Sequence, residues 1–268
     1  MRLVTYDRAG DRRLGAWVDD AVVDLPAAVG HPAFPATMEA LITRQRGTAL
    51  EAARAALANP SYVEEGRVRS PRLLAPLTLA GTDRGLVLGP GDDVRWPEGT
   101  ACRWQPEIAC VLGRSGRNLS PEAAWGLVFG YLMVSTWSPC GDEDDAQPGA
   151  RLATSLGPCV VTADGFDPCQ VTVTARVNGG AWIRERMGDA ASRFATTIAR
   201  ASREREVSAG EVFSSPPFDR PVSGGGAREL SRGATVELEA GPFGVLRNRL
   251  RFVNAVPRPQ PVGVGRTR

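Results

Sequence analysis

Three side chains of complementary chemistry alternate along one short stretch of the sequence: Arg103, Gln105 and Glu107. Side chains two residues apart point to the same face of a β-strand, so a strand here presents a guanidinium, an amide and a carboxylate together. A guanidinium is a permanent cation suited to carboxylates and enolates, and a carboxylate can take up and return a proton. We therefore predict catalytic roles for Arg103 and Glu107 and a substrate-binding role for Gln105. The alternative for Arg103 is a solvent-exposed or ion-paired arginine.

The composition excludes several other chemistries. All 32 basic residues are Arg, none is Lys, and His31 is the single histidine among 268 residues. A Schiff-base lysine, a P-loop lysine and a zinc site of several histidines are therefore excluded, and a Ser-His-Asp triad would have to use His31. Because His31 precedes Pro32, a turn or surface position is the default for it. A GC-rich coding sequence would also replace Lys by Arg, so the missing lysines alone do not indicate function.

Charge and hydropathy indicate which partners and which cell compartment to expect. The net charge is +2, with acidic and basic residues interspersed, which argues against a nucleic-acid partner. The opening segment lacks the apolar region of a signal peptide, and no run of about 18 apolar residues occurs, so we expect no membrane partner. Five widely spaced cysteines are typical of reduced thiols. We expect a soluble cytoplasmic protein.

Predicted secondary structure and prolines divide the chain into an N-terminal domain, a main domain and a tail. Short strands are predicted over residues 2–6, 14–18 and 21–25, followed by two short helices over 37–57 that are interrupted at Gly47. Prolines flank the region near residue 70, where we place a boundary. The sequence thus predicts an N-terminal domain over 1–70, a main domain over 71–254 and an unstructured tail over 255–268.

The main domain is predicted to consist mostly of strands. Apolar residues alternate over 171–177 and are followed by Asn178-Gly179, the strongest short-range hairpin signal. A helix capped by Asp189 is predicted from the apolar face that ends at Ala201. Further strands are expected over residues 107–112, 130–135, 159–162, 211–214, 235–239 and 245–253.

The order of several motifs resembles the fumarylacetoacetate hydrolase superfamily. The segments that carry the resemblance are MRLVTYDRAG, RLLAPL, GPGDDVRWP, WQPEIACVLGRSGRNL, GYLMVSTWS, LGPCVVTAD, VNG, SAGEVF and GPFGVLRNRL. The resemblance implies an α+β fold that is mainly β, a mixed β-sandwich roll or barrel preceded by a small α+β N-terminal domain. It also implies a dimer, and a chemistry of small keto and enol acids at a divalent metal.

The resemblance also shows where this sequence departs from the family pattern. The family's Trp-Glu-x-Glu strand corresponds to residues 104–107, where Gln105 replaces the first glutamate and Glu107 keeps the second. The third family ligand, an aspartate, falls on Thr136. Hard divalent cations need oxygen ligands with offsetting negative charge, so one carboxylate of three predicts no metal site.

Other parts of the family machinery are missing as well. The segment that carries its catalytic His and Glu is deleted between RLLAPL and GPGDDV, and its lysine would fall near 148–150, where no lysine exists. Its Thr-Gly-Thr-Pro loop corresponds to residues 214–217, in an uncertain register. Base composition can replace lysines but cannot delete a segment, so the deletion points away from hydrolase chemistry.

The residues around Thr136 complete the candidate site. We predict that Thr136, Trp137 and Ser138 bind the substrate together with Gln105, with core packing as the alternative for Trp104 and Trp137. Cys140 takes the place of a family arginine, and its default role is packing. We expect the acidic run over 142–145 to be a solvated surface. We expect the glycine-rich segment over 223–226 to be a loop over the site.

Three functions follow from these residues. The first is a metal-independent enzyme that isomerises, decarboxylates, cyclises or cleaves a small keto or enol acid, without a cofactor, as a homodimer in specialised biosynthesis. The second is a non-catalytic ligand-binding or structural relative. The third is a hydrolase that binds Mg or Mn through substitute ligands from the acidic run.

Overall fold

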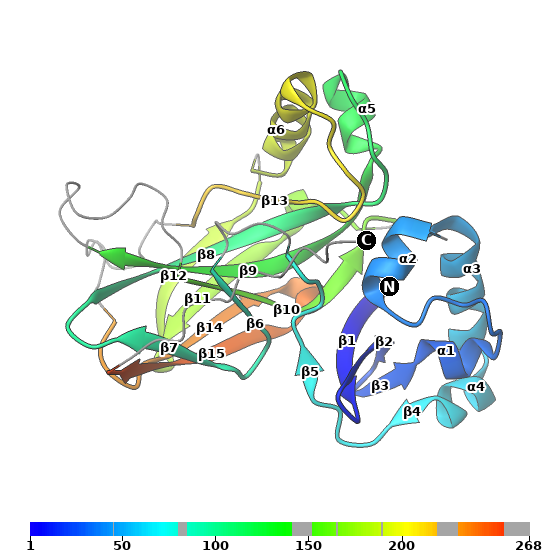
Figure 1. Ribbon diagram of the computed structural model, residues 1–268, viewed down its shortest axis with the longest axis horizontal. Coiled ribbons are helices and arrows are strands. Elements are labelled where there is room, and N and C mark those ends of the chain that lie inside the picture. The colour runs from blue at the N-terminus through cyan, green and yellow to red at the C-terminus, as the bar shows by residue number, and fades with distance from the viewer. Residues whose placement is uncertain are drawn as a thin grey trace, which may run out of the picture.

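The computed structural model of the chain describes residues 1–44, 46–79, 85–140, 152–164, 166–188, 190–218 and 230–254 (Figure 1). The strands are β1 (Arg2–Arg8), β2 (Asp11–Val18), β3 (Ala21–Asp24), β4 (Arg67–Val68), β5 (Leu73–Leu74), β6 (Leu86–Leu88), β7 (Asp93–Pro97), β8 (Ala101–Leu112), β9 (Val128–Cys140), β10 (Ala153–Thr162), β11 (Thr172–Val177), β12 (Gly180–Arg186), β13 (Val212–Ser214), β14 (Thr235–Ala240) and β15 (Val245–Val253). The helices are α1 (Leu25–Val29), α2 (Met38–Arg44), α3 (Arg46–Leu57), α4 (Pro60–Glu65), α5 (Pro121–Trp125) and α6 (Ala190–Glu204).

These strands form two sheets in the described residues. The larger has ten strands in the order β13-β8-β9-β10-β1-β2-β3-β4, with β5 added to β1 and β6 added to β10. The smaller has five strands in the order β12-β11-β14-β15-β7. Pairing is antiparallel except for β6 on β10 and β7 on β15. The predicted fold class, α+β and mainly β, is confirmed.

The N-terminal strands belong to the same sheet as the main domain. β1 pairs with β2 on one side and with β10 on the other, where Arg2 lies opposite Val161. β5, which follows the predicted boundary at residue 70, also returns to β1. The meander and its helices α1–α4 gather at one end of the molecule (Figure 1). The hydrogen-bonded sheet is therefore continuous between the two predicted domains.

Helices α2 and α3 form because their apolar residues repeat at helical spacing behind a polar cap. The Thr37 hydroxyl accepts a hydrogen bond from the Ala40 N–H at 3.2 Å at the start of α2. Met38, Leu41 and Ile42 then share one buried face. This face packs in one hydrophobic cluster with Val111 and other side chains of the larger sheet. The N-terminal helices therefore cover one face of the strands that carry the candidate site.

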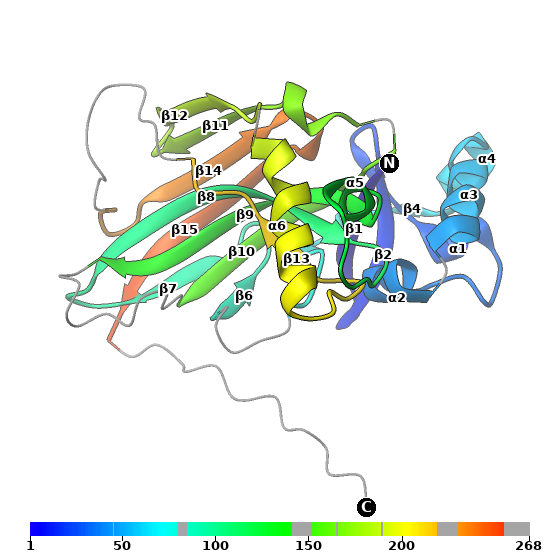
Figure 2. The same ribbon diagram turned by 90° about the horizontal axis from the view of Figure 1, so that it is seen from above.

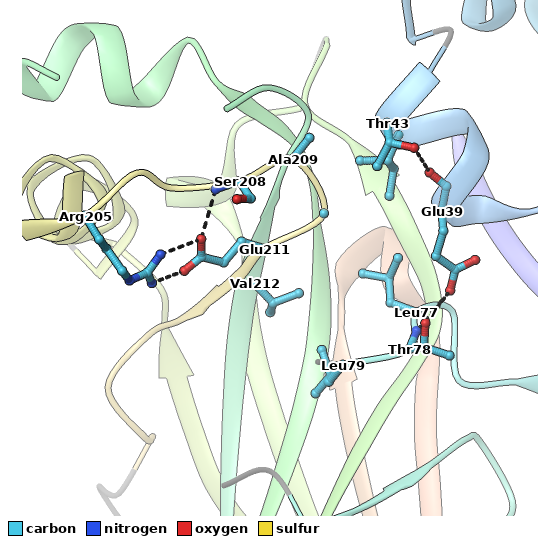
Figure 3. Close-up of a pocket in the computed structure, with 12 residues that line it drawn as sticks. Glu39, Thr43, Leu77, Thr78, Leu79, Arg205, Ser208, Ala209, Glu211 and Val212 are labelled. Atoms are coloured by element: carbon cyan, nitrogen blue, oxygen red, sulfur yellow. Dashed lines mark hydrogen bonds and ion pairs between the residues drawn. The ribbon is translucent and has the colours of Figure 1, made fainter. Parts of the chain in front are cut away.

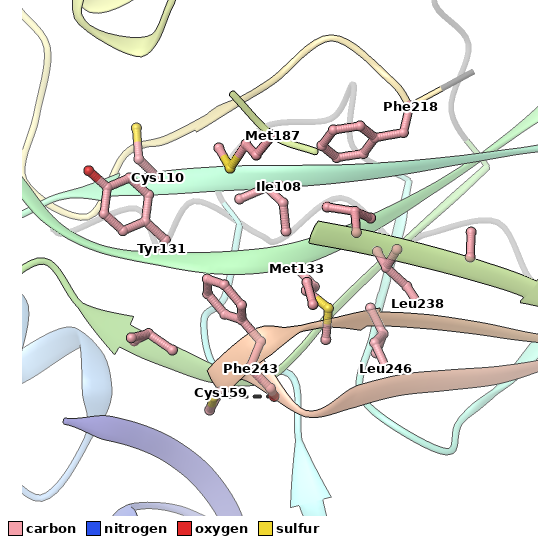
Figure 4. Packing of buried hydrophobic residues seen from close by; sticks show 14 of the residues in the cluster. Ile108, Cys110, Tyr131, Met133, Cys159, Met187, Phe218, Leu238, Phe243 and Leu246 are labelled. Atoms are coloured by element: carbon pink, nitrogen blue, oxygen red, sulfur yellow. Dashed lines mark hydrogen bonds between the residues drawn. The ribbon is translucent and has the colours of Figure 1, made fainter. Parts of the chain in front are cut away.

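A second hydrophobic cluster lies between the two sheets (Figure 4). Ile108 and Met133 from the larger sheet and Leu238 and Leu246 from the smaller one belong to it and are almost fully buried. This packing holds β8 and β9 from the side opposite to α2. The two faces of these strands are thus covered by two different cores.

The predicted hairpin and the long helix are confirmed. Asn178 and Gly179 have φ values of 51° and 79°, as a two-residue type I′ turn between β11 and β12 requires. Phe194 and Ile198 form the buried face of α6, and α5 and α6 lie together outside the sheets (Figure 2). The predicted cap Asp189 lies outside the described residues.

Other elements differ from the prediction. Gly47, where an interruption was predicted, lies within helix α3. Helices α1, α4 and α5 and strands β4, β5, β6 and β7 were not predicted, because each is too short to establish a period. Pro60 is the first residue of α4, a position that tolerates its missing N–H. None of the helices in the described ranges combines the length and apolar character needed to cross a bilayer.

Candidate functional site

Strand β8 has two faces of different character. Cys102, Trp104, Ile108 and Cys110 belong to the core between the sheets. Ala109, like Val111, belongs to the cluster under α2. Because side chains alternate along a strand, Arg103, Gln105 and Glu107 share the second face, as the sequence predicts.

Exposure falls steadily along this face. Arg103 is exposed, Gln105 is half-buried, and Glu107 is only 2% exposed. The three side chains therefore lead from the surface toward the interior of the larger sheet. A small polar molecule that entered from the Arg103 end would meet a cation first and a carboxylate last.

The neighbouring strand completes the polar surface. Thr136 of β9 lies opposite Gln105, and Ser138 lies opposite Arg103. The Thr136 hydroxyl, 1% exposed, donates a hydrogen bond of 2.9 Å to Oε1 of Glu107. This bond fixes the orientation of the Glu107 carboxylate. Five of the six predicted site residues are thus on one face of two paired strands.

The next strand adds a residue that the sequence analysis missed. Thr154 of β10 lies opposite Thr136 in the register and is 1% exposed. The alternation of β10 could have indicated it, but the predicted strand began only at Cys159. We call the set Arg103, Gln105, Glu107, Thr136, Ser138 and Thr154 the polar strip.

The sixth predicted residue, Trp137, is not on the polar strip. It is fully buried in the core between the sheets, and its Nε1 donates a hydrogen bond of 3.1 Å to the Ser155 hydroxyl. Its ring stacks on Trp104 with centroids 6.2 Å apart, and Trp104 stacks on Trp182 at 5.4 Å. Trp137 cannot share a face with Thr136 and Ser138 because it lies between them on one strand. This placement agrees with the core alternative for both tryptophans.

The remaining candidates take varied positions. His31 is exposed, and its Nδ1 accepts a hydrogen bond of 3.1 Å from the Ala33 N–H, as expected of a turn histidine. Ser215 exchanges backbone and side-chain hydrogen bonds with Ile108, which fixes the chain after β13 against β8. The side chain of Cys140, the acidic run at 142–145, residues 148–150 and the glycine-rich loop at 223–226 lie outside the described residues.

The oxygen donors of the polar strip carry little negative charge. Glu107 is its single carboxylate; Gln105 offers a neutral amide, and the Thr136 proton is directed at Glu107. Across the described residues, no three His, Cys, Asp or Glu side chains come close enough to hold a metal ion together.

Comparison with known proteins identifies a family and two relatives. The family model described as fumarylacetoacetate (FAA) hydrolase C-terminal matches residues 50–251. The chain is 30% identical over 177 residues to an oxaloacetate tautomerase, mitochondrial fahd2, of Xenopus laevis, a match that covers 60% of this chain and 54% of the relative. It is 25% identical over 173 residues to oxaloacetate tautomerase YisK of Bacillus subtilis, covering 61% and 58%. These matches span little more than half of either relative.

The fold is shared with solved structures at lower identity. Maleylpyruvate hydrolase from Sphingobium sp. SYK-6 superimposes with a TM-score of 0.74 and 21% identity, covering 94% of this chain and all of that one. The α+β, mainly β fold expected from the sequence motifs is therefore confirmed by its similarity to this solved structure.

Proposed function

The chain belongs to the fumarylacetoacetate (FAA) hydrolase C-terminal family, and from this premise we propose that it is an enzyme that moves a proton on a small keto or enol acid without a bound metal ion. One observation carries the proposal. Glu107, a single buried carboxylate oriented by Thr136, ends a polar strip that starts with an exposed arginine. Such a strip offers the two groups that enolisation needs, a proton acceptor and a fixed positive charge.

The donor set argues against a metal in this reaction. Mg²⁺ and Mn²⁺ take oxygen ligands, and carboxylates offset the cost of stripping water from the ion. The polar strip supplies one carboxylate, and its other oxygen donors, such as the Gln105 amide and the Thr136 hydroxyl, are neutral and offset none of the charge of the ion. The described residues therefore do not fit a divalent cation, and we derive no step through one.

The proposed reaction needs only this chain's own groups. The Glu107 carboxylate takes a proton from the carbon beside the substrate carbonyl, and the electron pair left behind moves to the carbonyl oxygen. The Gln105 amide and the Arg103 guanidinium stabilise the negative charge of the resulting enolate and of the acid group. Glu107 then returns this proton to the enolate oxygen, which gives the enol and restores the carboxylate, and the reverse sequence gives the keto acid. Thr136 is a positioning residue because it acts through Glu107.

The spacing of the strip suits a small substrate. Four residues of a strand span roughly 13 Å between Arg103 and Glu107, at about 3.3 Å per residue. The long, flexible side chain of Arg103 can reduce the distance between its guanidinium and the Glu107 carboxylate. The tautomerase names of the two relatives make keto–enol exchange of an oxo diacid the first reaction to test, ahead of decarboxylation, cyclisation or C–C cleavage.

The decisive experiment follows the ultraviolet absorbance of enol-oxaloacetate as the protein converts it to the keto form. The protein is treated with a chelator and desalted, and its metal content is measured. We expect acceleration over buffer in the metal-free protein and a loss of about 10²- to 10⁴-fold in Glu107→Gln, which cannot accept the proton. Glu206→Gln, at an exposed glutamate, is the matched control.

Two results would replace the proposal. Activity that returns only with Mg²⁺ or Mn²⁺ bound in stoichiometric amount would favour a metal site that uses the acidic run at 142–145. Absence of both turnover and binding of oxo acids would favour a non-catalytic relative.

The role of Arg103 is tested separately. Arg103→Gln removes the charge that would hold the acid group, so we expect kcat/KM to fall about ten- to hundredfold, the equivalent of one charged hydrogen bond. Arg95→Gln changes another exposed arginine on β7 and serves as control. Equal activity of the two variants would leave Arg103 a surface residue.

A further inference from the structure

A cavity of about 470 Å³ separates helix α2 from the turn that precedes β13 (Figure 3). Its walls come from three parts of the chain: α2, residues 77–79 after β5, and residues 205–212 between α6 and β13. Most small-molecule sites are concave spaces of this size between elements. The cavity therefore has the dimensions of a ligand site.

The cavity is distinct from the polar strip. Val212 at its wall pairs with Val111 of β8, four residues from Glu107 along the same strand. That separation is roughly 13 Å at about 3.3 Å per residue. A ligand here would not contact Glu107, so the cavity calls for its own explanation.

The middle of the cavity is apolar and its two rims are polar. Leu77, Leu79 and Val212 lie between Glu39 on one side and Glu211 on the other (Figure 3). The lining also includes Ile42 of α2 and Ala209 of the turn. This arrangement suits a molecule with a hydrocarbon body and a polar end.

The two carboxylates at the rims differ in their hydrogen-bond partners. Glu211 is held within its own turn, where it pairs with Arg205 and accepts a hydrogen bond of 3.0 Å from the Ser208 N–H. Glu39 uses only Oε1, which accepts hydrogen bonds from the Thr78 N–H at 3.0 Å and hydroxyl at 3.1 Å and lies 3.6 Å from Arg12. Its Oε2 accepts no hydrogen bond from the described residues, which leaves one carboxylate oxygen available to a ligand.

Charge pairing selects the class of that ligand. Arg205 neutralises Glu211, and Arg12 lies 3.6 Å from Oε1 of Glu39, so Oε2 of Glu39 is the acceptor that a ligand can use. A carboxylate oxygen accepts most strongly from a positively charged N–H donor. We propose that this cavity binds a small organic cation with an apolar body, of the alkylammonium class. Its ammonium group donates to Oε2 of Glu39, and its hydrocarbon chain covers Leu77 and Val212.

The test uses n-hexylammonium, with hexanol and hexanoate as the neutral and anionic counterparts. Saturable binding is measured by ligand-observed NMR and by the rise of Tm with ligand concentration. We expect hexylammonium to bind more tightly than hexanol and hexanoate more weakly than either. Hexanoate binding as tightly as hexylammonium, or no saturable binding of hexylammonium, would overturn the proposal.

Two pairs of variants locate the site. Glu39→Gln keeps an acceptor for Thr78 but removes the charge, so hexylammonium should bind about threefold or more weakly while hexanol is unaffected. Glu51→Gln, at an exposed position of α3, is its control. Thr43→Trp, on the cavity wall, should block all binding, whereas Thr48→Trp, at an exposed position of α3, should not. Unchanged hexylammonium binding in Glu39→Gln or in Thr43→Trp contradicts the assignment.

Discussion

Asp24 and Glu107 are the two carboxylates buried within the described residues, 3% and 2% exposed, yet their surroundings differ. Asp24 ends β3 in the N-terminal meander and caps α1, where it accepts a hydrogen bond of 3.0 Å from the Ala27 N–H. The Tyr6 hydroxyl donates to it at 2.7 Å, and the Arg13 guanidinium donates at 3.0 Å. Arg8 forms a further ion pair. Every one of these partners lies within 18 residues of Asp24 in the sequence.

Glu107 is placed by long-range pairing instead. Its partner Thr136 lies 29 residues away on β9, and the side chains that share its face lead out to the exposed Arg103. The partners of Asp24 close around the carboxylate and join β1, β2, β3 and α1. The neighbours of Glu107 on its own strand face become more exposed toward Arg103. The comparison teaches that two equally buried carboxylates can differ in their surroundings, one enclosed by ion pairs and the other at the end of a polar strip.

The largest expected effect on stability concerns Asp24, the carboxylate enclosed by ion pairs. Asp24→Asn removes the charge that two arginines face, so we expect the free energy of unfolding to fall by about 1.5–3 kcal/mol, the usual worth of hydrogen bonds to a charged group. Urea unfolding measures this loss. Asp20→Asn, at an exposed position of the neighbouring turn, should change stability by less than about 0.5 kcal/mol. A similarly small loss in Asp24→Asn would remove the structural role.

Asp24 also predicts how the stability of the protein falls at low pH. Burial alone would raise the pKa of Asp24, but hydrogen bonds from Arg13, the Ala27 N–H and Tyr6 outweigh it, and the pKa is lowered. The stabilisation is therefore present above the unfolded-state pKa, about 3.9, and is lost as the pH falls through the lower folded-state pKa. Wild type should lose stability more steeply than Asp24→Asn below about pH 4. Parallel pH profiles for the two proteins would contradict this linkage.

A smaller effect comes from the phenol beside Asp24. Tyr6→Phe removes one hydrogen bond and should cost about 1 kcal/mol of unfolding free energy. Burial and the hydrogen bond to Asp24 raise the pKa of Tyr6 to about 12. The folded state then holds this proton more tightly, so the contribution is present below the unfolded-state pKa, about 10, and is lost as the pH rises toward 12.

Urea unfolding at several alkaline pH values measures this contribution. Stability should decline less between about pH 10 and 12 in Tyr6→Phe than in wild type. Tyr62→Phe, at an exposed tyrosine of α4, should follow wild type. An equally steep decline in Tyr6→Phe would assign the alkaline loss to other groups.

The smallest stability effect is expected at Glu107, the proposed catalytic carboxylate. Glu107→Gln keeps a carbonyl oxygen for the Thr136 hydroxyl and removes a charge whose burial opposes folding. We expect the free energy of unfolding to change by less than about 1 kcal/mol, while turnover is lost. A destabilisation as large as that of Asp24→Asn, seen by the same urea titration, would make Glu107 a second structural carboxylate.

Some positions of the candidate site follow directly from local sequence. The alternation of Arg103, Gln105 and Glu107 is enough to put them on one face, because successive strand side chains point in opposite directions. The same rule, applied to residues 136–138, would have separated Trp137 from Thr136 and Ser138. Alternation along β10 could have given the face of Thr154, but its place opposite Thr136 depends on β10 pairing with β9.

By itself, the sequence determined the local elements of this protein. Alternating apolar residues set the strands, Asn178-Gly179 set the hairpin, and the spacing of Met38, Leu41 and Ile42 set a buried helix face. These features depend on residues only a few positions apart, whose backbone geometry fixes which side chains share a face.

Only the tertiary structure decided which elements became neighbours. Pairing of β1 with β10 joined the N-terminal meander to the main sheet, and packing of α2 near the turn before β13 formed the cavity. It also separated two equally buried carboxylates into a closed ion-pair cluster and the end of a polar strip. Such contacts join residues far apart in the chain, where many alternative pairings are compatible with one local pattern, and burial of the two cores selects among them.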